Sequence, residues 1–279
     1  MKGFGEQNKS KKKINKINKP SKEKIINQAF HFHSQGKIAE AAKYYQYFID
    51  QGFKDAIVFC NYGVILKNFG KLRDAELLYR KAIELNPKHV EAHYNLGIIL
   101  DKIGKLREAE LSYNKAIELN PKHIKAHYNL GNLLSDLGKL QEAELSHRKA
   151  IELNPNYIKA YYSLSLLKYS DDNNIWKKQL FSKSILNQKS KKDQIDIYFA
   201  RANILHKEKN YEDSSKFLKL ANELKLILHP SNSDALINKS KVLLIESIKK
   251  EISQKLHTES LESIFIVGMP RSGSTLLES

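Results

Sequence analysis

The last nineteen residues of the chain carry its clearest pattern for chemistry. Residues 263–268 form a short apolar, β-branched run that predicts a buried strand. A loop containing Arg271 and Gly273 follows, and residues 276–279 begin like a helix. A strand, a glycine-containing loop and a helix together aim backbone N–H groups and a positive helix end at a phosphate. The segment therefore predicts a site for an anionic group.

The two glycines of this segment, Gly268 and Gly273, have the spacing found in a Walker A loop. The next residues are Ser274 and Thr275, where that loop has a lysine followed by Ser or Thr. The basic group is Arg271, inside the loop. Because nothing stands at the usual place to reach β- and γ-phosphates, the pattern disfavours a nucleoside triphosphatase.

Two histidine pairs, His89 with His93 and His123 with His127, have the i, i+4 spacing that can put two metal ligands on one helix face. The second pair follows the first by a 34-residue step, and tyrosines take both places one step further on. Packing explains such recurrence better than ligation, so we predict no metal site. The single cysteine, Cys60, excludes a disulfide framework and a cysteine metal cluster.

The histidine pairs and Cys60 lie in a region with an internal 34-residue repeat. Glycine and alanine recur at that spacing at Gly36, Gly70, Gly104 and Gly138, and at Ala41, Ala75, Ala109 and Ala143. A fixed period of this length is the signature of a solenoid. One unit cannot bury its own apolar face, so neighbouring units must stack.

Within the unit 90–123, apolar residues at helical spacing predict one helix over 90–103 and another over 106–119. Gly104 ends the first helix by permitting a left-handed turn, and Pro121 stops the second.

Small residues are predicted to set the crossing of these two helices. Gly97 and Ala109 lie where the helices cross and let their backbones approach. Ala109, Tyr113 and Ala116 are predicted to face inward.

The Asn-Leu-Gly, Gly-Lys-Leu-x-x-Ala-Glu and Lys-Ala-Ile-Glu-Leu-Asn-Pro patterns of these units resemble the tetratricopeptide repeat. The resemblance implies an all-α solenoid of antiparallel helix pairs over residues 22–170. Its repeats are expected at 22–55, 56–89, 90–123, 124–157 and, in part, 158–170. Residues 171–257 are predicted to be connecting helices, with a helix over 175–186 around the core residue Trp176 and a degenerate repeat at about 195–228.

The first helix of each such repeat lines the concave surface, and asparagines lie there in register at Asn61, Asn95 and Asn129. A side-chain amide offers a donor and an acceptor, so it can pair with a peptide backbone of any sequence. The resemblance implies a peptide-binding asparagine ladder, with Tyr94 and Tyr128 as aromatic anchors. The alternative is that the asparagines cap or bridge neighbouring helices.

The Pro-Arg-Ser-Gly-Ser-Thr-Leu run after the 263–268 strand resembles the phosphosulfate-binding loop of sulfotransferases, particularly the protein-tyrosine branch. The resemblance makes residues 261–279 the start of a P-loop-like α/β domain. It implies 3′-phosphoadenylyl sulfate as co-substrate, with its 5′-phosphate held by backbone N–H groups. Those groups would come from Ser272, Gly273, Ser274 and Thr275. Arg271 would be catalytic, by stabilising charge on the oxygen that bridges sulfate and phosphate.

The sequence stops four residues after Thr275. We interpret it as an incomplete gene product whose catalytic base and 3′-phosphate contacts lie beyond Ser279. The chain alone is therefore expected to be inactive.

Composition limits the remaining classes. The 279 residues carry a net charge of +16, and 41% are hydrophobic, which fits a soluble, core-forming protein. No apolar run approaches the ~20 residues of a membrane span, and we expect a cytoplasmic protein. Residues 1–21 are lysine-rich and polar and are predicted to be a disordered basic tail. Only 6 of 47 basic residues are arginine, so no specific nucleic-acid partner is expected.

These features favour the repeat region of a sulfotransferase that transfers a sulfuryl group to a hydroxyl acceptor, protein tyrosine among them, with the repeats binding peptide or partner protein. The alternative is a non-catalytic interaction scaffold. A repeat-bearing glycosyltransferase ranks last, because its family does not show this loop.

Overall fold

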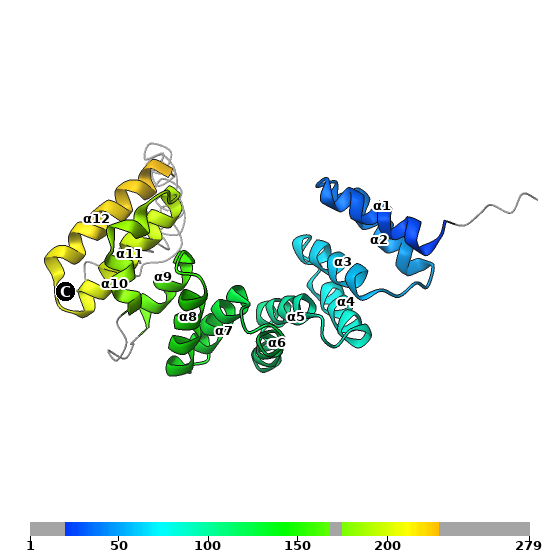
Figure 1. The fold of residues 1–279 in the computed structure, drawn as a ribbon, viewed down its shortest axis with the longest axis horizontal. Helices are drawn as coiled ribbons and strands as arrows, with labels where there is room; N and C mark the ends of the chain where they lie inside the picture. Colours follow the sequence, from blue (N-terminus) through cyan, green and yellow to red (C-terminus); the bar gives the residue numbers. More distant parts are fainter. Residues whose placement is uncertain (1–19, 168–174, 229–279) are drawn as a thin grey trace, which may run out of the picture. The chain divides into compact units, whose positions relative to one another are not determined.

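The computed structural model describes residues 20–167 and 175–228. These residues form α-helices and one short 3-10 helix and contain no strand (Figure 1). The helices are α1 (Lys22–Ser34), α2 (Ile38–Asp50), α3 (Ala56–Asn68), α4 (Leu72–Leu85), α5 (Val90–Lys102), α6 (Leu106–Leu119), α7 (Ile124–Asp136), α8 (Leu140–Leu153), α9 (Ile158–Leu166), α10 (Ile175–Phe181), η1 (Lys183–Leu186), α11 (Lys191–Lys207) and α12 (Tyr211–Leu228).

Four groups of predictions fall outside the described residues. They are the basic tail up to residue 19, the end of the partial repeat at 168–170, the connecting segment over 171–174 and 229–257, and the strand and anion-binding loop over 261–279. The chain divides into two units, Met1–Lys225 and Leu226–Ser279. The fold and site described here belong to the first, apart from the last three residues of α12. Among the described residues, no helix is both long enough and apolar enough to cross a bilayer.

Consecutive helices pack in pairs, as the 34-residue period predicts. The pairs are α1 with α2, α3 with α4, α5 with α6, and α7 with α8. The second helix of each pair also packs on the first helix of the next, which joins the pairs into a solenoid. After the fourth pair the pattern changes, because α9 packs chiefly on α11.

The helix ends follow the glycine and proline signals. Helix α6 has its predicted bounds, and α5 ends one residue earlier than predicted, at Lys102. Gly104 has φ +80°, and the N–H of Lys105 bonds back to the carbonyl of Leu100 at 2.8 Å, which closes the turn. At the other end, the Asn120 side chain accepts a hydrogen bond from the N–H of Lys122 at 3.1 Å.

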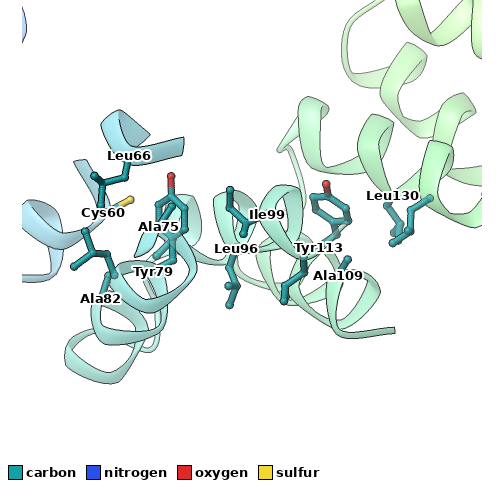
Figure 2. Packing of buried hydrophobic residues seen from close by; sticks show 14 of the residues in the cluster. Cys60, Leu66, Ala75, Tyr79, Ala82, Leu96, Ile99, Ala109, Tyr113 and Leu130 are labelled. Carbon is teal, nitrogen blue, oxygen red and sulfur yellow. The ribbon is translucent and has the colours of Figure 1, made fainter. Parts of the chain in front are cut away.

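The crossing of α5 and α6 differs from the prediction in one respect. A methyl group on Gly97 would lie 2.7 Å from Cδ1 of Tyr113, so the glycine makes room for an aromatic ring rather than for the partner backbone. Tyr113 and Ala109 are both buried, as predicted. Figure 2 shows these residues in the apolar core that runs through the successive pairs. The same contact joins Gly63 to Tyr79.

The segment after the fourth helix pair is held in place by buried side chains. Trp176 is buried, as predicted, but the helix expected over 175–186 is divided into α10 and η1. Buried Arg201 of α11 bridges the two parts, since its guanidinium donates to the carbonyls of Leu180 and Ser182 at 2.9 Å each.

Candidate peptide-binding face

The candidate site lies on the first helices of the pairs, α3, α5, α7 and α9, which we call the A helices; α4, α6 and α8 are the B helices. Helix α5 contacts both α3 and α7, whereas consecutive B helices do not pack on one another to a comparable extent. The A helices therefore lie on the inner side of the stack and the B helices on its outer side.

Tyrosines of the A helices are held by aromatic contacts that recur with the repeat. The ring of Tyr94 lies 4.6 Å from that of His123, centroid to centroid. One repeat later Tyr128 contacts Tyr157 edge to face at 5.2 Å. Tyr94 and Tyr128 are both half-buried. Sequence reasoning missed these pairs, although their members recur with the 34-residue period.

The polar partners of His123 hold its ring in place. Its Nε2 lies 3.3 Å from a carboxylate oxygen of Glu91, and its Nδ1 accepts a hydrogen bond from the N–H of Ala126 at 3.1 Å. Burial is the main cause that raises the pKa of Tyr94, and Glu91 adds to it. The ring of Tyr94 therefore packs against a histidine ring that is itself held by two polar contacts.

Two of the three predicted asparagines lie beside tyrosines of the preceding repeat. Burial raises the pKa of Tyr45 to about 12, and the neighbouring Asn61 side chain opposes that rise. Burial likewise raises the pKa of Tyr113, and Asn129 opposes that rise. The Nδ2 group of Asn129 also donates to the Tyr94 hydroxyl at 3.3 Å. This last contact joins two neighbouring repeats, which is the bridging role that the sequence left open as the alternative. Peptide binding by these asparagines stays a prediction.

Asn95 departs from that pattern. It is only 7% exposed, its Nδ2 donates to the carbonyl of Glu91 at 2.9 Å, and its Oδ1 accepts from Lys67 at 3.1 Å. Burial, reinforced by Lys102, lowers the pKa of Lys67. The equivalent tyrosine, Tyr79, has a buried hydroxyl without a hydrogen-bond partner among the described residues.

The histidines of the i, i+4 pairs have separate partners. Nε2 of His93 lies 2.9 Å from the carbonyl oxygen of Pro87, and Nε2 of His127 lies 2.9 Å from that of Pro121. His123 contacts Tyr94 instead. Within the described part of the chain, no three His, Cys, Asp or Glu side chains gather as a metal site.

The predicted catalytic and co-substrate-binding residues cannot be placed beside this face. Arg271, Ser272, Gly273, Ser274 and Thr275 all lie outside the described residues.

The fold and this face define a helical-repeat protein. Models of the tetratricopeptide repeat match residues 90–123, 124–157 and 195–226, and a further TPR model matches residues 63–104. These segments are therefore tetratricopeptide repeats, and the match at 195–226 falls where a degenerate repeat is predicted.

Solved structures show the same fold. One is YrrB, described as a TPR protein with an unusual peptide-binding site. It is 22% identical, the match covers 71% of this chain and 99% of that one, and the TM-score is 0.53. MamA from Desulfovibrio magneticus RS-1, in a form from residue 41 to its end, is 18% identical over 73% of this chain and 94% of its own, with a TM-score of 0.50. None of the curated proteins matches the chain.

Proposed function

We propose that the chain is a protein-interaction scaffold whose inner side binds an extended peptide segment of a partner protein. The observation that carries this proposal is the row of half-buried aromatic rings on the A helices at Tyr94, Tyr128 and Tyr162. Neighbouring side chains already hold the first two rings, so little conformational entropy is lost when they contact a ligand. YrrB, which has the same fold, is described as having a peptide-binding site.

Polar groups beside these rings suit a peptide backbone. Asn129 and Asn132 are three residues apart on α7, so they lie on one face of the helix. Asn129 donates to Tyr94, which leaves its Oδ1 to accept from a peptide N–H. Asn132 accepts from Ser163 at 3.2 Å, which leaves its Nδ2 to donate to a peptide carbonyl. Such a pair can read a peptide unit without regard to its side chain.

Asn61 and Asn95 remain predicted contacts in this proposal. Asn95 would have to release Glu91 and Lys67 before it could bond a ligand. We therefore expect the centre of the site at Tyr128 and Asn129.

The test is selection of peptides from a phage-displayed random library against the immobilised chain. The selected peptides should bind about tenfold more weakly to Tyr128→Ala and to Asn129→Ala, the effect of removing one good contact. Tyr211→Ala, a change at a 58% exposed tyrosine of α12 outside the proposed site, serves as the control and should leave binding unchanged. Failure to select any peptide, or selected peptides that bind both variants like the unmodified chain, would refute the proposal.

A second candidate function rests on the loop sequence alone. We propose that the repeats accompany a sulfotransferase activity that uses 3′-phosphoadenylyl sulfate and a hydroxyl acceptor such as protein tyrosine. The co-substrate would supply the sulfuryl group. Backbone N–H groups of residues 272–275 would hold its 5′-phosphate, and Arg271 would stabilise charge on the bridging oxygen.

Calorimetric titration with 3′-phosphoadenosine 5′-phosphate tests this second candidate. The titration uses the full chain, which contains the loop. Binding that is lost in Arg271→Ala and Gly273→Val supports it. No binding, or binding that both variants retain, rejects it and leaves the scaffold proposal intact.

A further inference from the structure

The outer side of the stack carries a row of exposed leucines, and each follows a largely buried glutamate. This is the reverse of the usual arrangement, in which apolar side chains are buried and charged ones are exposed. Leu77, Leu111 and Leu145 occupy the same repeat position on the B helices α4, α6 and α8, and they are 53%, 70% and 67% exposed. The residue just before each leucine is a glutamate with a side chain only 13%, 19% and 8% exposed: Glu76, Glu110 and Glu144. We call the three leucines the outer leucine row.

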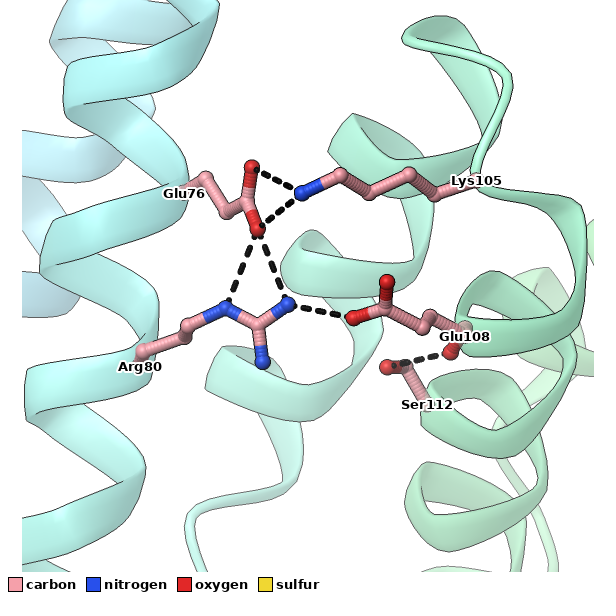
Figure 3. A network of polar contacts seen from close by, with 5 residues as sticks. All are labelled: Glu76, Arg80, Lys105, Glu108 and Ser112. Atoms are coloured by element: carbon pink, nitrogen blue, oxygen red, sulfur yellow. Dashed lines mark hydrogen bonds and ion pairs between the residues drawn. The ribbon is translucent and has the colours of Figure 1, made fainter.

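The buried glutamates have a role within the chain. Glu76 accepts hydrogen bonds from Arg80 of its own helix and from Lys105 of the next repeat at 3.0 Å (Figure 3). Glu110 bonds Lys139 in the same way at 2.7 Å. These two pairs join successive repeats, and Glu144 pairs with Arg148 of its own helix at 2.7 Å. The fold therefore explains the glutamates.

The fold does not explain the leucines in this way. Leu111 borders an open hollow of about 400 Å³ that is also lined by Ile83 and Leu96. Leu77 borders a neighbouring hollow of about 630 Å³ beside Ile103. Charged side chains, Arg80 among them, complete the lining of both hollows. Exposed apolar side chains that recur in three successive repeats, next to hollows that also contain charged groups, indicate a surface that another molecule covers.

Charges flank each leucine in a constant order. Three residues before the leucine stands a carboxylate and four residues after it stands a lysine; the triplets are Asp74, Leu77, Lys81; Glu108, Leu111, Lys115; and Glu142, Leu145, Lys149. Residues at these spacings share one helix face. The outer side therefore carries an acidic row, the outer leucine row and a basic row, side by side.

This arrangement is its own complement. When two copies face each other about a two-fold axis that runs along the outer leucine row, each leucine meets its own counterpart. The same rotation reverses the direction of the B helices, so the acidic row of one copy faces the basic row of the other. Isologous dimers need a surface of this self-matching kind. Asp74 and Lys81, which would meet across the contact, form no ion pair with another described residue.

We propose that the outer leucine row is a dimerisation surface whose occupant is a second copy of this chain, with the B helices of the two copies antiparallel and Leu111 at the centre. The inner side, which we propose as the peptide site, stays open in such a dimer. Each dimer would then present two peptide sites, which raises its avidity for a partner with repeated segments.

Sedimentation equilibrium of the full chain over a concentration series tests the dimer. The net charge of +16 opposes self-association, so the measurement is made near 0.15 M salt, where charges are screened beyond about 8 Å. The unmodified chain should follow a monomer–dimer equilibrium. Leu111→Glu should raise its Kd by at least about tenfold, because each dimer contains this residue twice at its centre. Ile57→Glu, a change at a 54% exposed residue of helix α3, is the matched control and should leave Kd unchanged.

Charge exchange tests the antiparallel geometry of the B helices. Lys81→Glu and Asp74→Lys should each weaken the dimer, and the double variant should restore it, because the two residues exchange signs across the contact. Circular dichroism confirms that each variant is folded. A chain that stays monomeric throughout the series overturns the proposal. So does a dimer that Leu111→Glu leaves unchanged, or one that the double variant fails to restore. None of these results bears on peptide binding by the inner side.

Discussion

The imidazole of His147 lies directly against the α-carbon of Gly131, where a methyl group would come within 2.7 Å of its Cε1. In the two preceding repeats a tyrosine ring takes that place, at Tyr79 and Tyr113. His147 is 1% exposed, and its Nδ1 has no hydrogen-bond partner among the described residues. The fourth repeat therefore holds a titratable ring where the second and third have a phenol.

Stability should fall as the pH drops from about 6.5 to about 4. Burial lowers the pKa of His147 to about 4 in the folded chain, whereas an exposed histidine has a pKa near 6.5. Between these values the unfolded chain binds the proton and the folded chain does not, so acid favours unfolding. The loss should reach about 3 kcal/mol and level off below pH 4. Urea unfolding followed by circular dichroism across this range measures it.

His147→Tyr is the matched variant, because it restores the residue found at Tyr113. It should remove this part of the pH dependence without lowering stability at neutral pH. A variant that keeps the same acid-induced loss would show that another group causes it.

The tyrosine hydroxyls of two equivalent positions should contribute differently to stability. The hydroxyl of Tyr45 lies 3.0 Å from Nδ1 of His33, whereas that of Tyr79 is buried without a partner in the described part of the chain. Tyr45→Phe should cost about 1 kcal/mol by losing a hydrogen bond. Tyr79→Phe should be neutral or stabilising, since it removes an unsatisfied buried group. Thermal unfolding of both variants measures the difference, and equal costs would contradict it.

Much of this fold could be predicted because its signals are local. The helices end next to Gly104 and Pro121 because of the backbone properties of these two residues themselves. A 34-residue period with helical spacing is compatible with few folds. The residue that packs against Gly97 was harder to predict. Tyr113 and Ala109 lie on the same face of α6, so the sequence pattern does not say which of them meets the glycine.

The candidate site was harder to predict, because it depends on contacts between residues that are far apart in the sequence. Asn61, Asn95 and Asn129 occupy equivalent positions in the sequence. The side-chain oxygen of Asn95, however, already accepts a hydrogen bond from Lys67, 28 residues away. Which amide stays available depends on such distant contacts, and these carry no periodic signal.

The link between successive repeats should have a measurable electrostatic part. Burial alone would raise the pKa of Glu76, but hydrogen bonds from Lys105 and Arg80 outweigh it and hold the pKa below its ordinary value. Glu76→Gln should therefore cost about 0.5 to 1 kcal/mol at neutral pH. The difference should disappear as the pH falls through the lowered pKa, because the carboxyl is then protonated in the unmodified chain as well.

Glu118→Gln is the control for this pair, since Glu118 is 67% exposed and its one ion pair with a described residue is to Lys115 of its own helix. Its effect on urea unfolding should be close to zero. If the two variants behave alike at neutral pH, the contact between repeats adds nothing beyond an ordinary surface pair.

Arg201 should be the most sensitive polar residue of the segment after the fourth helix pair. Its guanidinium satisfies the carbonyls of Leu180 and Ser182 and lies 5.7 and 5.4 Å from the ring centroids of Phe181 and Phe217. Arg201→Ala leaves both carbonyls without this donor and removes both ring contacts, so it should cost about 3 kcal/mol.

Arg201→Lys keeps a charge but lacks the planar fork that reaches two carbonyls at once, so it should recover only part of that loss. Arg73→Ala, a change at an exposed arginine of α4, should stay within about 0.5 kcal/mol. Limited proteolysis locates the effect, because cleavage near residues 182–190 should accelerate in Arg201→Ala while the first four helix pairs stay protected. Uniform cleavage along the chain would show instead that Arg201 stabilises the whole stack.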